Sequence, residues 1–467
     1  MGDGDIEKAG DLDPQEYFDG LRDSFHPQRY TFKVAGEVLR SDVGLHRTFS
    51  RSVSTWRWPL WGVALKSVVP HRPEHGEGSR WRADAVFGED FHRAAAPDLS
   101  MVQTGLGERE AVLTEGALVV AYEDEGEERK FVLSVGQGWQ SVSVKALADG
   151  DQQEAVADLF KDIERWIAKN NFYRGQKIDA DGKFLELEDV SEEDLILDKD
   201  TKRELFRNVK LMVDRHEDYA KWNIPSNRGV ILAGPPGNGK TLSMKVLAKL
   251  LDCTFMWVSP AHVENGFAAI YEFARELAPT VVLLEDADSF GLDRRIGGFN
   301  GALGELLGIL DGFEKNRGVI TILSSNYAEV LDSALTQRPG RFDTKIRIDP
   351  PGVVEAFEIM TRTLDRRKTV YQGNPGALKN IAAQLVASQA SGAYVVEVVN
   401  YASILAVENG RGRGAQLVVT EEDFNLSAGR VIAHLGLDSR VEMAVAQEGI
   451  LKWGGWPKGS FHGQEGT

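Results

Sequence analysis

The residue pattern with the clearest chemical meaning is a glycine-rich loop, Gly-Pro-Pro-Gly-Asn-Gly-Lys-Thr, between an apolar run and a helical pattern. Glycines let consecutive backbone N–H groups wrap a phosphate, and the helix N-terminus adds positive potential. The lysine reaches the terminal phosphates, and the threonine offers a hydroxyl to Mg²⁺. A ligand-free turn is the alternative, which the complete pattern in this setting disfavours. The predicted phosphate-binding residues are Gly234, Pro235, Pro236, Gly237, Asn238, Gly239, Lys240, Thr241 and Leu242.

A second apolar run, residues 281–284, ends in the acids Glu285 and Asp286. Strand ends of a parallel sheet lie at its ligand-binding edge, so we expect both acids beside the loop. One carboxylate can hold the hydrated Mg²⁺ while the other orients or deprotonates the attacking water. Acids at a strand end are often only solvated, but the upstream loop favours the hydrolytic hypothesis.

A third polar position is Asn326, which follows the apolar run 319–323 and two serines. An amide at this strand end can position the lytic water against the γ-phosphate. Asparagine is also a common turn former, and taken alone that alternative is favoured.

These side chains require a core that brings several strand ends together. From residue 195 to residue 351, compact apolar runs alternate with helical stretches. This alternation predicts an α/β P-loop NTPase core, a five-stranded parallel sheet with helices on both faces. Residues 352–435 predict a C-terminal helical lid, and residues 436–467 a tail.

The chain before this core has a different pattern. Residues 1–150 predict a β-rich N-terminal domain, in which the runs 117–122 and 130–135 form a hairpin. Residues 151–194 predict an amphipathic helix and a connector. The tryptophans there lie among arginines, a mixture that can recognise protein or single-stranded nucleic acid. Tryptophan is usually buried, and two of them alternate as on a strand face, so we expect core positions for Trp56, Trp58, Trp61 and Trp81.

Composition limits the classes of partner. The net charge of −17 would repel a phosphate backbone, so nucleic acid is an unlikely partner. The single cysteine, Cys253, permits no intramolecular disulfide and fits a reducing compartment. The apolar stretch 58–69 is interrupted and falls short of the ~20 residues that a membrane helix needs. Since the first residues also lack a signal-peptide pattern, a soluble cytoplasmic protein without a membrane contact is predicted.

With these motifs in place, residues 195–418 resemble the AAA ATPase family. Beyond the phosphate loop, the resemblance rests on Leu-Asp-Gly-Phe at residues 310–313, on Asn326 as the first sensor, and on residues 332–343. It implies ATP and Mg²⁺ as cofactors, ATP hydrolysis, and a homo-oligomeric ring that is a hexamer or heptamer.

The resemblance also implies roles for residues far from the loop. In the family, the arginines that match Arg338 and Arg341 reach the nucleotide of the adjacent subunit, where a guanidinium stabilises the transferring phosphoryl group. Solvated loop arginines are the alternative. Ser391, Gly392 and Ala393 are similar to the lid motif that packs against the adenine.

Within the family, the chain resembles the mitochondrial chaperone ATPases that translocate the folded Rieske iron–sulfur subunit, and their soluble bacterial relatives. The residues that carry this likeness are 222–229 and the order Leu284-Glu285-Asp286, where most AAA proteins have Asp-Glu. Glu285 then aligns with the metal-side acid and Asp286 with the water activator. Because Asp286 is one methylene shorter, slower hydrolysis is expected, and the division of roles stays open.

Two further departures concern how the ring acts. The arginine motif has one extra residue, since Thr336 and Gln337 stand where one residue is usual. Residues 259–267 lack the aromatic–apolar–Gly triplet by which threading ATPases grip an extended chain, which argues against threading. Phe267 is the aromatic that could line a pore, but it shares a helical spacing with Ile270 and Tyr271, so core packing is the better prediction.

The sequence thus predicts a ring-forming, Mg²⁺-dependent ATPase that remodels or chaperones a protein client bound through the N-terminal domain. An ATP-gated scaffold with very slow hydrolysis is the alternative suggested by the inverted acids. A nucleic-acid remodeller is a further alternative, which the acidic charge disfavours.

Overall fold

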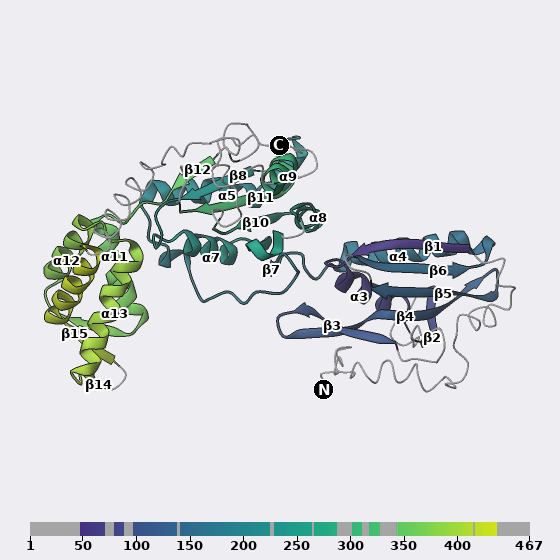
Figure 1. The fold of residues 1–467 in the computed structure, drawn as a ribbon, viewed down its shortest axis with the longest axis horizontal. Coiled ribbons are helices and arrows are strands. Elements are labelled where there is room, and N and C mark those ends of the chain that lie inside the picture. Colours follow the sequence, from purple (N-terminus) through teal and green to yellow (C-terminus); the bar gives the residue numbers. More distant parts are fainter. Residues whose placement is uncertain are drawn as a thin grey trace, which may run out of the picture. The chain divides into compact units, whose positions relative to one another are not determined.

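The computed structural model describes residues 47–70, 79–87, 97–137, 141–224, 228–263, 266–286, 301–310, 317–326, 342, 344–413 and 416–436 (Figure 1). They fall into two compact units. One contains the described residues up to Glu186 together with Cys253–Val281. The other contains Leu187–Asp252 and the described residues from Val282 onward. Within these segments, no helix combines the length and the apolar composition needed to cross a membrane.

The N-terminal part of the chain folds into an antiparallel sheet, which confirms the predicted β-rich region. Its strand order is β1 (Arg47–Ser54), β6 (Ser141–Ala148), β5 (Glu127–Gln137), β4 (Glu108–Asp124) and β2 (Trp81–Phe87), with β3 (Asp98–Gly105) paired to β4. Figure 1 shows β1, β6, β5 and β4 side by side. The expected hairpin turns at Glu125 and Gly126, whose positive φ angles of 51° and 84° suit a two-residue turn.

Two helices, α3 (Trp58–Val68) and α4 (Gln153–Asn170), pack against each other and against this sheet. A short 3-10 turn, Gly150–Gln152, precedes α4. Four tryptophans of this region are at most 9% exposed, which confirms the core positions predicted for Trp56, Trp58, Trp61 and Trp81. The strand expected around Trp58 is wrong. Pro59 lies in the first turn of α3, where its fixed φ favours a helix. The N–H that proline lacks would have no hydrogen-bond partner within the helix at this position.

A second sheet carries the predicted polar strand ends. Its order is β12 (Thr344–Arg347), β8 (Arg228–Ala233), β11 (Val319–Ser325), β10 (Thr280–Leu284), β9 (Thr254–Val258) and β7 (Lys177–Asp179). Strands β11 and β12 run parallel to β8, and β7 runs parallel to β9. The five predicted strands are present. The sixth strand, β7, was not predicted, because a run of three residues is too short to show a strand pattern. The central strands β10 and β11 are buried throughout, as expected when helices cover both faces.

The helices of this core follow the predicted alternation. They are α5 (Lys199–Asp214), α6 (His216–Lys221), α7 (Lys240–Leu250), α8 (Ala268–Glu276) and α9 (Gly301–Leu310), with 3-10 turns at Glu192–Asp194 and Pro260–Val263. Phe267, Ile270 and Tyr271 at the start of α8 are buried, so the predicted core packing of Phe267 is confirmed. The aromatic ring is therefore not exposed on the described surface.

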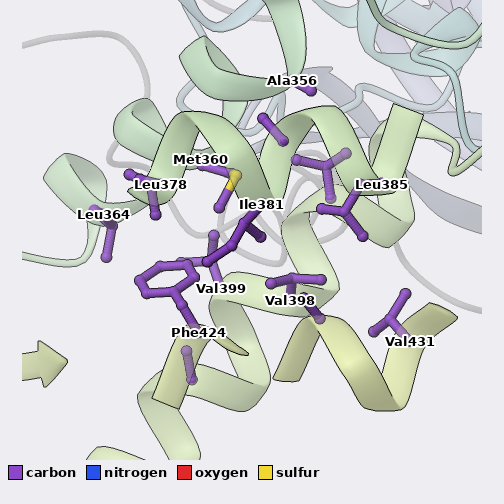
Figure 2. Close-up of a cluster of buried hydrophobic side chains, with 14 of the residues drawn as sticks. Ala356, Met360, Leu364, Leu378, Ile381, Leu385, Val398, Val399, Phe424 and Val431 are labelled. Atoms are coloured by element: carbon purple, nitrogen blue, oxygen red, sulfur yellow. The ribbon is translucent and has the colours of Figure 1, made fainter. Parts of the chain in front are cut away.

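The C-terminal described residues form a helical domain with its own core. Helices α11 (Val353–Arg366), α12 (Pro375–Ala387) and α13 (Gly392–Glu408) are followed by a last helix at residues 421–436. Figure 2 shows Met360, Ile381, Val399 and Phe424 meeting in a cluster of buried side chains. The domain also contains a small sheet, β13 (Thr369–Gln372), β15 (Gln416–Thr420) and β14 (Gly412–Arg413), which a purely helical prediction lacked. These strands are too short to give a clear alternating pattern.

Candidate nucleotide-binding site

The glycine-rich loop lies between the end of β8 and the start of α7, as the sequence predicts. Three of its glycines have φ angles that other residues rarely adopt, 154° at Gly234, 77° at Gly237 and 94° at Gly239. A Cβ at Gly234 would lie 2.0 Å from the carbonyl oxygen of Ile348, so the loop closely approaches the backbone of the residue that follows β12. The glycines are therefore required both for the loop's shape and for its close contact with the neighbouring strand.

Lys240, the first residue of α7, is folded back over this loop. Its Nζ donates hydrogen bonds to the carbonyl oxygens of Gly234, at 2.7 Å, and Pro235, at 3.0 Å. The side chain is only 7% exposed. The ammonium group thus lies inside the curve of the loop, at the N-terminus of α7, where the helix dipole also favours an anion.

The two predicted metal-binding side chains are in direct contact with each other. The Thr241 hydroxyl donates a hydrogen bond of 2.5 Å to Oε1 of Glu285, although 44 residues separate them in the chain. A hydroxyl and a carboxylate are hard oxygen ligands of the kind Mg²⁺ prefers, and Mg²⁺ takes its other ligands from water and substrate phosphates. The donor set therefore fits Mg²⁺.

Asp286 follows Glu285 and has a left-handed backbone, with a φ of 52°. Its N–H donates a hydrogen bond of 3.0 Å to the hydroxyl of Ser324 on the adjacent strand β11. Asn326 stands two residues beyond Ser324, at the end of that strand. Two adjacent strands therefore deliver both acids and the sensor asparagine to one sheet edge.

A cavity of about 260 Å³ continues the site toward the C-terminal helices. It brings together six predicted residues, namely Gly237, Asn238, Gly239, Leu242, Gly392 and Ala393. Two hydrogen bonds join its walls directly. The Gly392 N–H donates to Oδ1 of Asn238 at 3.1 Å, and the Ala393 N–H donates to the carbonyl oxygen of Gly237 at 2.8 Å. The N-terminus of α13 is thus attached to the phosphate loop itself.

The family model described as "ATPase family associated with various cellular activities (AAA)" matches residues 230–350. This segment runs from the strand before the loop, through both acids and Asn326, to just beyond β12. The segment is therefore similar to an AAA ATPase domain. Members of this family bind ATP with Mg²⁺ and hydrolyse it, and the phosphate loop and the Thr241–Glu285 contact fit that chemistry.

Curated relatives extend this likeness beyond the matched segment. The 26S proteasome regulatory subunit 8 homolog of Saccharomyces cerevisiae is 34% identical over 244 residues, which make up 49% of this chain and 58% of the relative. The 26S proteasome regulatory subunit 8 of Caenorhabditis elegans is 33% identical over 263 residues, or 53% and 60% of the two chains.

A relative of another kind is similar over a comparable length. The chloroplastic ATP-dependent zinc metalloprotease FTSH 2 of Arabidopsis thaliana is 31% identical over 251 residues, which are 50% of this chain and 34% of the relative. The chain therefore spans no more than 60% of the length of any of these three relatives.

The wall of the cavity also contains residues that the motifs did not indicate. They come from the connector before α5 and from α11 and α13, outside the segment matched by the AAA model: Asp194, Leu195, Ile196, Leu197, Ile359, Arg362, Thr363, Arg366 and Val396. The sequence contains only weak signals for these residues. One is the apolar triplet at residues 195–197 after an acidic stretch, and the other is a pair of residues four apart on α11, Arg362 and Arg366. The apolar members of this wall suit the flat base of a nucleotide, namely Leu195, Ile196, Leu197, Ile359 and Val396.

The acidic connector at residues 188–194 links two helices of the site. Glu188 and Asp189 pair with Lys245 and Lys249 of α7. On its other side, Arg362 of α11 lies 2.5 Å from Glu193 and 3.4 Å from Asp194.

Asp194 has the least exposed side chain among the acids of this connector. Burial acts to raise the pKa of its carboxyl group, but hydrogen bonds from Ser191 and the positive charges of Arg366 and Arg362 outweigh it. The pKa therefore lies below its ordinary value, and the group is ionised at neutral pH. The connector is a charged strap between the phosphate-loop helix and the C-terminal domain.

Several predicted elements lie outside the described residues. These include Arg338 and Arg341, most of the Leu-Asp-Gly-Phe motif, and the C-terminal tail. The geometry above therefore concerns the remaining predicted site residues.

Proposed function

We propose that the chain is a subunit of a homo-oligomeric ring, a hexamer or heptamer, that uses Mg²⁺-dependent ATP hydrolysis to remodel or chaperone a protein client. The observation that carries this proposal is the hydrogen bond between Thr241 and Glu285 beside the phosphate loop. A metal ligand from the loop and an acid from a distant strand lie in contact there, which is the arrangement that phosphoryl transfer needs.

In this mechanism each side chain has a separate task. Lys240 binds the terminal phosphates, and Thr241 and Glu285 hold Mg²⁺, which neutralises charge developing on the phosphate oxygens when bound. Asp286 orients the attacking water and accepts its proton, and Asn326 fixes the water's direction. Because α13 is hydrogen-bonded to the loop, a change in the phosphates can reach the C-terminal domain.

The ring supplies the remaining group. We assign Arg338 and Arg341 to the nucleotide of the neighbouring subunit, where an arginine can add a factor of roughly 10³ to 10⁵ to the rate. The names of two relatives, as regulatory subunits of the 26S proteasome, support a role within an assembly.

Client handling differs in this proposal from the gripping of an extended chain. Phe267 is buried, and the sequence of residues 259–267 offers no aromatic–apolar–Gly triplet. We propose that the β-rich N-terminal domain binds the client in the cytoplasm and that nucleotide cycling moves this domain. The likeness to Rieske-protein chaperones belongs to this proposal and rests on residues 222–229 and on the Glu285-Asp286 order.

The test uses two inactive variants, Lys240→Ala and Arg341→Ala. Each alone should release phosphate at background rate, the first for lack of nucleotide binding and the second for lack of the arginine in trans. After mixing and subunit exchange, some sites combine an intact Lys240 with an intact arginine from the neighbour. We expect the mixture to release phosphate again. If fluorescence shows that subunits have exchanged and no mixture releases phosphate above background, the shared site is contradicted.

A second candidate, an ATP-gated scaffold, is favoured by one observation, the shorter acid at position 286. It predicts that wild type and Asp286→Ala release phosphate at the same near-background rate while both bind ATP. A clear difference between them would leave the ATPase proposal standing.

A further inference from the structure

Ser324 occupies an unusual position for a polar residue. It lies near the end of β11, a strand whose seven residues are all buried, and is itself only 1% exposed. A hydroxyl in such a place costs free energy unless it is hydrogen-bonded. Its oxygen accepts the backbone N–H of Asp286 from the next strand.

The residue that Ser324 holds is in a sparsely populated conformation. A left-handed backbone is strained for a residue with a Cβ, although aspartate tolerates it better than most. Such a conformation persists where the surroundings stabilise it. At Asp286 it directly follows Glu285, so it decides in which direction the second carboxylate leaves the strand end.

We propose that Ser324 is a positioning residue for ATP hydrolysis. By accepting the N–H of Asp286, its hydroxyl stabilises the left-handed backbone and so sets where the short carboxylate stands relative to Thr241 and Glu285. The proposal rests on the proposed function, in which Asp286 handles the attacking water. It explains how an aspartate can serve at a position where most of the family has the longer glutamate.

The decisive pair is Ser324→Thr and Ser324→Val, because their side chains have the same shape and only threonine retains the oxygen. A misplacement of about 1 Å can cost roughly 100-fold in rate, so we expect kcat to fall at least about tenfold in the valine variant. The KM for ATP should change little, since the phosphate loop is untouched. The threonine variant should keep most of the wild-type kcat.

Two measurements separate positioning from a merely structural role. Thr321→Val removes a hydroxyl at equal burial from the same strand, three residues earlier, and should leave kcat unchanged. In an Asp286→Asn background, Ser324→Val should produce no further loss, because the residue through which it acts is already disabled.

The outcomes distinguish this inference from the function on which it rests. If Asp286→Asn abolishes phosphate release while the threonine and valine variants have equal kcat, Ser324 does not position the acid and the inference is overturned. Equal losses from Ser324→Val in both backgrounds, or a loss confined to KM, would overturn it as well. If wild type and Asp286→Asn hydrolyse ATP at the same rate, the proposed function itself fails.

Discussion

The two ends of the nucleotide site are built in different ways. The phosphate end consists of one continuous loop, whose carbonyl oxygens Lys240 contacts, and a strand end, whose Glu285 is hydrogen-bonded to Thr241. The base end is a cavity whose added wall comes from the connector, α11 and α13. The phosphate end lies inside the segment matched by the AAA family, and that wall lies outside it.

This difference follows from the chemistry of the ligand. A triphosphate is highly charged and needs donors at fixed points, which a short loop of fixed sequence provides. A base is flat and mostly apolar on its faces, so many combinations of apolar side chains can enclose it. Single substitutions should therefore be severe at the phosphate end and graded at the base end.

The largest effect is expected at Lys240. Lys240→Ala removes a charge-assisted contact with the phosphates, so ATP should bind at least roughly 100-fold more weakly in titration calorimetry. Lys245→Ala, five residues along the same helix, removes only a pair with the exposed Glu188 and is the matched control. Equal affinities of the two variants would show that the phosphate end does not dominate.

A smaller but clear effect is expected when the base cavity is filled. Ala393→Leu adds three carbons to the cavity wall next to Gly237, and ATP affinity should fall roughly tenfold or more, because overpacking costs about 1 to 3 kcal/mol. Val407→Leu adds volume at an exposed position of the same helix and should bind ATP as wild type does. A competition experiment between ATP and inorganic triphosphate, which has no base, sharpens this test. Ala393→Leu should bind inorganic triphosphate as tightly as wild type does.

Removal of wall volume should have a milder effect. Ile359→Ala deletes apolar contact area on the α11 side of the cavity, for which we expect about fivefold weaker ATP binding. Val354→Ala shortens an exposed side chain on the same helix and serves as the control. A loss as large as that of Lys240→Ala would remove the contrast between the two ends.

The smallest effect is expected at the charged strap. Arg362→Gln removes the pairs with Glu193 and Asp194, and because the guanidinium is partly exposed, ATP affinity should fall by no more than about fivefold. The difference from wild type should shrink further as salt is raised, since exposed ion pairs are screened. Arg203→Gln, which breaks an exposed pair on α5, is the control, and a salt-independent loss at Arg362 would assign it a direct contact with the nucleotide.

The sequence predicted those parts of the molecule whose function is local. The loop at residues 234–241 is recognisable because its function depends on a few adjacent backbone and side-chain groups. Glu285 and Asp286 could be placed beside it because strand ends of a parallel sheet share one edge. Burial of the four N-terminal tryptophans followed from their size and apolar character.

The parts that the sequence did not predict depend on contacts between distant segments. Leu195 and Ile359 face the same cavity only because α11 folds against the connector. Ser324 acts through Asp286, which lies at the end of the neighbouring strand. The sequence does not specify the register between these two strands. The alternation of Trp56 and Trp58 favours a strand, but Pro59 starts a helix there, and two residues are too few for their spacing to outweigh that.

The most direct test of the two-ended site is a structure with a slowly hydrolysed ATP analogue and Mn²⁺ in place of Mg²⁺. We predict a metal bound by the Thr241 hydroxyl, phosphates wrapped by residues 234–241, and an adenine against Ile359 and Ala393. Phosphates in the loop with the adenine outside this cavity would contradict the assignment of the base end. A metal bound away from both Thr241 and Glu285 would contradict the assignment of the phosphate end.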